Sequence, residues 1–193
     1  MYRKILLVVL LSVATGFCVS AQKISGDVSP LKDQTTVNVA IDFSTTLING
    51  KAEEKYIAEE TKGKNDEEKA GWMEEWKEKM PSESYVLLIT GMKSELGENL
   101  FLPAEFPDAE YTINIKVKDI TTGYFAGPFS KPSAIKADVS FVKTGETTPF
   151  ATIEFKNSCS PASSVMPYFV TRVSLSFGKL GDEIGELIYK KLK

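Results

Sequence analysis

Histidine is absent from all 193 residues of the chain, and this limits the chemistry that the protein can perform. Ser–His–Asp and Cys–His catalysis are excluded in their usual forms, because both need an imidazole base. The cysteines are Cys18 and Cys159, so a structural zinc site is not expected either. Carboxylate, lysine or tyrosine chemistry stays open. We nominate no catalytic residue and expect no metal and no cofactor.

Asp138 and Glu154 are the one pair of carboxylates that the sequence suggests for hydrolysis. Glycosidases place two carboxyl groups about 5 to 9.5 Å apart on either side of a cleft. Both residues fall on the polar face of predicted strands, beside Lys116, Lys118, Lys136, Lys156 and Asp42. Nothing apolar on that face would desolvate a carboxylate and raise its pKa. We therefore interpret it as a solvated face with charges paired across strands, and keep a carboxylate-based hydrolase acting on glycans as a third hypothesis.

The connection Thr121–Ser133 is unusual, because it carries three aromatic residues where a plain turn would be polar. These residues are Tyr124, Phe125 and Phe129, and glycines and prolines separate them. A rigid aromatic surface of this kind can anchor an interface with a partner. The preferred alternative is that the aromatic rings close the open end of the core. Under the first interpretation, this connection is the candidate partner-binding site.

A second candidate site is an apolar cleft between the helices and the sheet. Its walls would be Trp72 and Trp76 on a helix, with Phe101 and Phe106 from the apolar loop that follows. Such a cleft would suit a carrier of small apolar ligands. The simpler interpretation is that the tryptophans belong to a helical stripe packed on the core.

Four segments alternate apolar and polar residues with the period of two that is typical of half-buried strands. They are Val37–Phe43, Tyr111–Lys118, Ile135–Phe141 and Ala151–Lys156. Strands with one apolar and one charged face are typical of antiparallel sheets that are covered on one side. We predict an α+β fold, a two-layer sandwich of a mainly antiparallel four-stranded sheet with helices on one face and a C-terminal helix.

The helices are predicted from apolar residues three and four positions apart. One covers Lys51–Glu60, and another covers Asp66–Met80 and ends at Pro81. A third begins near Ser82 or Ser84 and stops at Gly97. Loops are expected at Glu98–Asp108 and Asn157–Pro167. The stretch Phe169–Phe177 fits a strand or a helix, and we prefer a helix that continues to the C-terminus.

The first 21 residues resemble a secretory signal peptide. Arg3 and Lys4 precede the apolar run Ile5–Phe17, which is too short to span a membrane, and cleavage is expected after Ala21. A lipid anchor on Cys18 is the alternative, although the bulky Phe17 does not suit it. Removing the leader lowers the basic residues from 23 to 21 against 26 acidic ones, a net charge of −5. The remaining single domain, 22–193, should therefore not bind nucleic acid. We also expect that it is not a transmembrane protein. The lone Cys159 is expected to be buried.

Several motifs resemble those of uncharacterised secreted proteins of Bacteroidetes. They are Gly123-Tyr-Phe-Ala-Gly-Pro-Phe-Ser-Lys-Pro-Ser-Ala-Ile135, Asp138-Val-Ser-Phe-Val142, Arg172 with Gly178-Lys-Leu-Gly181, and Ile41-Asp-Phe-Ser44. The pair Ser176-Phe177 before Gly178-Lys179 departs from the pattern. The resemblance implies an extracytoplasmic location, a compact α/β domain and a helical C-terminus. It implies no activity and no catalytic residue.

These observations favour a non-enzymatic periplasmic or secreted module that binds a protein or a component of the cell envelope. A carrier of small apolar ligands is the alternative, and the glycan hydrolase is the second alternative. Neither the partner nor the oligomeric state follows from the sequence.

Overall fold

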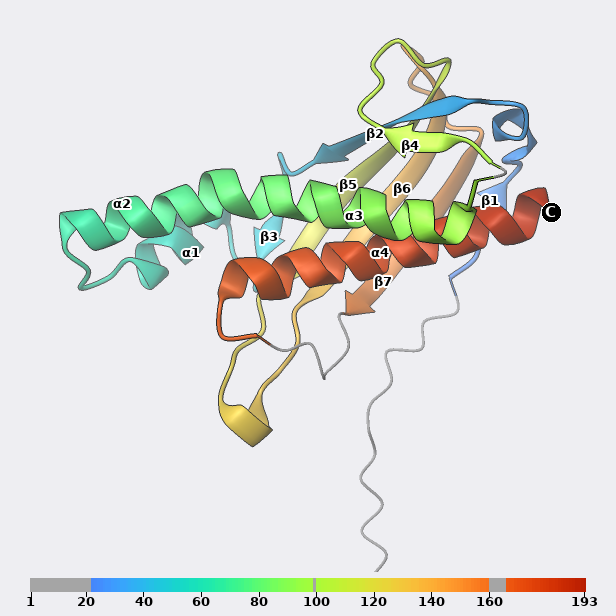
Figure 1. Cartoon of the computed structure of the whole chain (residues 1–193). Helices are drawn as coiled ribbons and strands as arrows, with labels where there is room; N and C mark the ends of the chain where they lie inside the picture. Colours follow the sequence, from blue (N-terminus) through green and yellow to red (C-terminus); the bar gives the residue numbers. More distant parts are fainter. Residues whose placement is uncertain (1–21, 99, 160–165) are drawn as a thin grey trace, which may run out of the picture.

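The structure is a computed structural model that describes residues 22–98, 100–159 and 166–193 (Figure 1). A twisted sheet lies behind two long helical segments that cross the same face of it. The predicted cleavage site after Ala21, and the lipid-anchor alternative at Cys18, lie outside the described residues. So does the side chain of Cys159, for which burial was predicted.

The sheet has seven strands in the order β1-β7-β6-β5-β2-β4, with the short β3 also paired to β5. The strands are β1 (Ser25–Gly26), β2 (Thr36–Asp42), β3 (Leu47–Ile48), β4 (Leu102–Ala104), β5 (Tyr111–Thr121), β6 (Ala134–Lys143) and β7 (Ala151–Cys159). Strands β5, β6 and β7 form an antiparallel meander, and β1 adds antiparallel to β7. Strands β2 and β3 run parallel to β5, and β4 runs parallel to β2.

The prediction of a mainly antiparallel four-stranded sheet is therefore wrong. The sheet is mixed, because β2 pairs with β5 from Asn38↔Thr112 to Asp42↔Lys116 in the parallel direction. Alternating burial indicates that one face of a strand is covered, and it carries no information on strand direction. The predicted loops at Glu98–Asp108 and Asn157–Pro167 are also partly wrong, since they contain β4 and the end of β7. Strands as short as β3 and β4 leave no periodic signal.

The helices are α1 (Glu53–Glu60), α2 (Asp66–Glu74), α3 (Met80–Leu96) and the C-terminal α4 (Phe169–Leu192). A capping box starts α2, in which Asn65 Oδ1 accepts from the Glu68 amide and Glu68 Oε2 accepts from the Asn65 amide, each at 2.9 Å. The preferred helical interpretation of Phe169–Phe177 is confirmed.

Pro81 does not end a helix, contrary to the prediction. A π-helical turn, η2 (Glu75–Lys79), joins α2 to α3 without a break, and Pro81 lies in the first turn of α3. Proline lacks the amide that would donate to the preceding turn, and the π turn, which changes the spacing of the helical hydrogen bonds, lies just before it.

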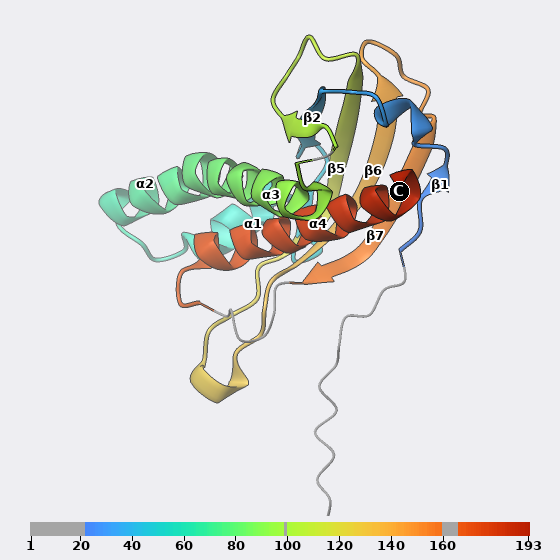
Figure 2. The same ribbon diagram turned by 45° about the vertical axis from the view of Figure 1, so that its right-hand side comes forward.

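Helices α3 and α4 lie side by side against the sheet, and glycines allow them to approach closely (Figure 2). A Cβ atom placed on Gly181 of α4 would lie only 2.1 Å from the carbonyl oxygen of Leu88 on α3. A Cβ on Gly91 of α3 would lie 2.3 Å from the carbonyl oxygen of Gly178. No other residue type fits either position unless the two helices move apart.

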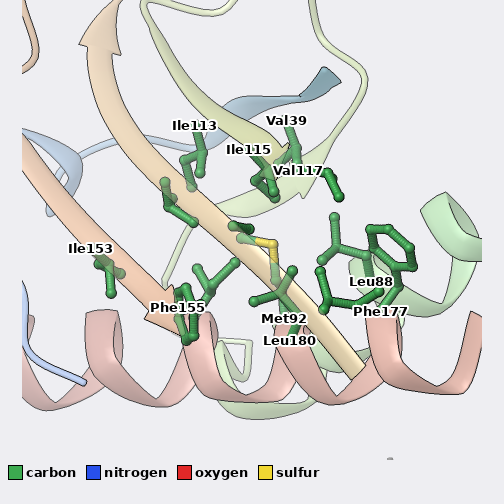
Figure 3. Close-up of a cluster of buried hydrophobic side chains, with 14 of the residues drawn as sticks. Val39, Leu88, Met92, Ile113, Ile115, Val117, Ile153, Phe155, Phe177 and Leu180 are labelled. Atoms are coloured by element: carbon green, nitrogen blue, oxygen red, sulfur yellow. The ribbon is translucent and has the colours of Figure 1, made fainter. Parts of the chain in front are cut away.

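The core lies between this helix pair and the sheet, as Figure 3 shows for Ile115, Met92 and Phe177. The buried faces of the three long strands are the predicted ones. Their fully buried members are Ile113, Ile115, Val117, Ile135, Ala137, Val139, Phe141, Ala151, Ile153 and Phe155. Helices contribute Leu88 and Met92 from α3, with Phe177 and Leu180 from α4.

Candidate binding surface

The aromatic residues of the connection between β5 and β6 point into solvent. Tyr124 is 52% exposed, Phe125 51% and Phe129 78%. Both views show this connection projecting beyond the end of the sheet (Figures 1 and 2). The preferred interpretation, in which the rings close the end of the core, is therefore wrong.

Hydrogen bonds hold the projecting connection in one shape. Tyr124 and Lys131 pair through both backbone groups, with N–H to O distances of 3.0 and 2.9 Å. A 3₁₀ turn, η3 (Gly127–Phe129), forms the tip. The Ser130 hydroxyl closes the turn by accepting from the Ala126 amide at 2.9 Å and donating to the Gly127 carbonyl at 2.6 Å.

Gly123 lets the chain enter this tip. Its φ is +64°, which favours glycine. A Cβ atom at this position would also lie 2.4 Å from the carbonyl oxygen of Lys131 across the hairpin. The backbone conformation and the close approach of the two strands thus both require glycine.

The buried guanidinium of Arg172, on α4, joins the base of this connection to the start of α4. Its Nε donates to the carbonyl oxygen of Thr122 at 3.3 Å. Its Nη1 donates to the carbonyl oxygens of Met166 and Pro167, each at 2.6 Å. Ser133, at the other side of the base, donates from its hydroxyl to the Arg172 carbonyl oxygen at 3.0 Å. Arg172 was not identified as a site residue from the sequence, because a lone arginine in a helix gives no local signal.

Two more exposed apolar side chains lie on the segment that Arg172 holds. Met166 is 45% exposed and Tyr168 is 74% exposed. We name the set Tyr124, Phe125, Phe129, Met166 and Tyr168 the aromatic end. These five are among the eight large hydrophobic residues that are exposed in the described part of the chain.

The aromatic end is also almost free of charge. The stretches 120–135 and 157–171 contain one charged residue between them, Lys131, whereas a quarter of the whole chain is charged. No carboxylate lies in either stretch. The acidic residues of the protein are therefore elsewhere along the chain.

The predicted carboxylate pair does come together, but on an open surface. Asp138 and Glu154 are directly paired across β6 and β7. Lys118 Nζ lies 2.7 Å from Asp138 Oδ1 and 3.4 Å from Glu154 Oε1. The hydrogen bond that Lys118 donates to Asp138 raises the pKa of Lys118. The three side chains are exposed on an open sheet face, whereas glycoside hydrolysis needs two carboxyl groups flanking a cleft.

The four residues predicted to wall a ligand cleft do not line a common cleft, because the two tryptophans lie far from Phe101 and Phe106. Trp72 and Trp76 stack at 5.6 Å between ring centroids, and both contact the ring of Phe169. Phe101 is buried beyond the far end of α3, a helix of 17 residues, and such a helix is about 25 Å long. Phe106 is half-buried in the loop after β4, where its amide donates to Asn38 Oδ1 at 3.0 Å. The tryptophans thus form an aromatic cluster within the helical layer, with Tyr56 as a further member.

A pocket of about 480 Å³ opens on one side of that cluster. Its lining comes from the β2–β3 connection, the start of α1, the π turn and the end of β5, with Phe43, Thr46, Ile48, Trp76, Met80 and Ile120 among the residues. At its rim Glu53 Oε1 accepts from Trp76 Nε1 and from Lys77 Nζ, both at 2.7 Å. Burial raises the pKa of Glu53, but these two hydrogen bonds outweigh it and hold the pKa below its ordinary value. Only Trp76 of the predicted cleft residues lines this pocket.

In residues 22–98, 100–159 and 166–193, no three His, Cys, Asp or Glu side chains gather as ligands for a metal ion. Among the same residues, none of the helices combines the length and the hydropathy needed to cross a bilayer.

Comparisons with known proteins found no relative by sequence and only distant structural matches. No protein family and no curated protein matches it. A PelC dodecamer from Paraburkholderia phytofirmans has a TM-score of 0.44 and 8% identity, covering 84% of this chain and 97% of that protein. A variant PelC dodecamer from the same organism has a TM-score of 0.34 and 10% identity, covering 83% and 95%. At these TM-scores a common fold is not established, so neither likeness bears on what this chain binds.

Proposed function

We propose that the protein is a non-enzymatic, extracytoplasmic binding module whose aromatic end docks onto a component of the cell envelope. One observation carries the proposal: Tyr124, Phe125 and Phe129 are at least half exposed although the connection that bears them is ordered by its own hydrogen bonds. The extracytoplasmic location rests on the signal-like leader of the sequence.

Physical reasons support a docking role. Exposed apolar side chains that gather at one place mark interaction surfaces more often than scattered ones do. Aromatic rings bury a large area with few rotatable bonds, so they are typical anchors of interfaces. The Tyr124–Lys131 pairing and the Ser130 bonds fix the backbone before any partner arrives. Binding would therefore cost little loop entropy.

The proposal is tested by sedimentation of the purified protein with envelope membranes from its own cells. We expect the wild type to pellet with the membranes, and the triple variant Tyr124→Ser, Phe125→Ser, Phe129→Ser to stay in the supernatant. The matched control is Leu102→Ser, because Leu102 is 44% exposed on β4 at the opposite end of the sheet. Circular dichroism must show that all three proteins are folded. Equal pelleting of the wild type and a folded triple variant would refute the docking role.

A second candidate function, the carrier of small apolar ligands, is supported by the 480 Å³ pocket beside Trp76. That volume lies within the range of about 300 to 1,000 Å³ that is typical of ligand pockets. Native mass spectrometry of the gently purified protein tests it, with Ile48→Trp as a variant that fills the pocket from β3. A bound mass that the variant loses is the expected result for a carrier. A clean apo mass in the wild type, unchanged after incubation with fatty acids, would exclude this function.

A further inference from the structure

We propose that the component met by the aromatic end is the lipid bilayer itself, at the level of the phospholipid headgroups. This inference rests on the proposed docking function and names the partner. It is carried by four features: the projecting shape, the hydrogen-bonded backbone of the tip, the aromatic side chains, and the distribution of charge.

The shape suits a flat, deformable surface. The connection between β5 and β6 extends past the sheet and past the start of α4 in both views (Figures 1 and 2). Its outermost turn, η3, carries Phe129, which at 78% is the most exposed large apolar side chain described. A narrow projection can enter the headgroup layer, which peripheral helices penetrate by about 5 to 10 Å.

The backbone of the tip is prepared for a medium poor in water. A peptide N–H that enters an apolar layer without a partner is costly. Within 124–132, backbone amides are hydrogen-bonded inside the tip at Tyr124, Ala126, Phe129, Ser130 and Lys131. Pro128 and Pro132 have no N–H. Five of the seven backbone amides in 124–132 thus have a partner within the tip.

The side chains match the chemistry of the interface. Phenylalanine rings suit the acyl boundary, while tyrosines keep the hydroxyl among the headgroups, as in the aromatic belts of membrane proteins. Tyr124 and Tyr168 are both exposed enough to do so.

Charge selects which end of the protein can approach. Without the leader the chain carries a net charge of −5, so an anionic lipid surface repels it on average. The connection 121–133 and the residues 166–171 have no carboxylate and one cation, Lys131, which can meet a lipid phosphate. This end can therefore contact an anionic bilayer without repulsion from its own residues, and it sets the orientation of the protein on the membrane.

The test uses protein-free vesicles of phosphatidylethanolamine and phosphatidylglycerol with bromine atoms on the acyl chains. Phe129→Trp places a fluorophore at the tip, and Leu102→Trp places one at the opposite end of the sheet. Both variants keep the native Trp72 and Trp76, so the difference between them reports the new ring. We expect the vesicles to quench Phe129→Trp and to leave Leu102→Trp unchanged. Replacement of Phe129 by serine should weaken vesicle binding about tenfold, as the loss of one buried aromatic ring implies.

The outcomes separate this inference from the docking function. Suppose that envelope membranes capture the wild type, the triple serine variant is not captured, and protein-free vesicles bind neither. The aromatic end then docks onto an envelope protein, and the bilayer inference is wrong while the docking function stands. Concentration-dependent dimers that disappear in Phe129→Ser would overturn the inference in a different way, by making a second copy the partner. Quenching of both tryptophan variants alike would also overturn it, because the protein would then bind without the predicted orientation.

Discussion

Arg172 Nε donates to the carbonyl oxygen of Thr122 at 3.3 Å, and this bond connects the C-terminal helix to the strand end from which the aromatic connection departs. The same side chain holds the carbonyls of Met166 and Pro167. One buried cation thus fixes two segments that are 44 residues apart, as counted from Thr122 to Met166. Residues at the aromatic end keep their relative positions through this contact.

Arg172→Lys should therefore loosen the aromatic end while keeping the charge. A lysine ammonium lacks the several N–H groups of the planar guanidinium, so it cannot bind all three carbonyls in the same geometry. Hydrogen bonds of charged groups contribute about 1.5 to 3 kcal/mol each. We expect a loss of about 2 to 3 kcal/mol in the free energy of unfolding, measured by urea denaturation. Limited proteolysis should also show faster cleavage within 121–133. Lys179→Arg, a change on the same helix, is the control. Unchanged proteolysis in Arg172→Lys would contradict the role of Arg172 in holding the aromatic connection.

Gly181→Ala should destabilise the protein, because its Cβ would lie 2.1 Å from the Leu88 carbonyl oxygen. Overpacking of this kind costs about 1 to 3 kcal/mol. The matched control is Gly178→Ala one turn earlier, where the nearest atom would be Leu87 Cβ at 3.5 Å. That variant should be neutral or more stable by up to about 1 kcal/mol, because alanine favours helices. Thermal unfolding of both variants measures the difference in stability. Equal stability of the two variants would show that α3 and α4 can move apart to make room for the methyl group.

Glu183→Gln should stabilise the protein at neutral pH. Burial raises the pKa of this carboxyl on α4 above its ordinary value of 4.5. Its contribution to stability is therefore complete below pH 4.5 and is lost as the pH rises through the raised pKa, where a buried charge must form. The variant should match the wild type in acid and exceed it at pH 7 in chemical denaturation.

The control for this change is Glu186→Gln on the same helix. Its carboxyl is exposed, and the hydrogen bond from Lys190 lowers its pKa. The effect of this variant should have the opposite sign, since the contribution of Glu186 is present above its ordinary pKa and is lost in acid. Variants that behave alike at both pH values would rule out burial as the cause.

Tyr56→Phe should reduce the loss of stability in alkali. Burial raises the pKa of Tyr56 to about 12, compared with about 10 for an unfolded tyrosine. The wild type should lose about 2 to 3 kcal/mol between these two pH values from this residue alone, at 1.36 kcal/mol for each unit of pKa. Near pH 7 the variant should be less stable by about 1 kcal/mol, because it lacks the hydrogen bond with Thr122. Denaturation series at pH 7, 9 and 11.5 would reveal whether the order of stability reverses.

The sequence predicted the buried face of each long strand correctly, because alternation directly reports which side is covered. It did not predict that β2 runs parallel to β5, since Val37 and Val39 would alternate in the same way in an antiparallel pair. Pro81 was mistaken for a helix end because the π turn before it depends on packing around Trp76 and leaves no pattern. Local sequence patterns therefore predicted which residues are buried, but they did not predict strand direction or the continuity of α2 with α3.

The candidate site shows the same division. Tyr124, Phe125 and Phe129 were identified from their types and spacing, but their exposure could not be predicted. Aromatic residues between glycines and prolines look alike whether they enter a core or leave it. The direction of the connection depends on Arg172 and Ser133, which contact each other across 39 positions of the chain. The pocket beside Trp76 gave no signal at all, because its lining comes from four separate segments.

The parallel pairing of β2 also sets an order of assembly. Strand β2 pairs with β5 from Asn38 to Thr112, which lies 74 positions later, so β2 has no partner in the centre of the sheet until β5 is present. The meander of β5, β6 and β7 closes through much shorter connections, and such local contacts form faster than distant ones. The N-terminal half of the chain therefore cannot complete its fold before Tyr111–Thr121 is available.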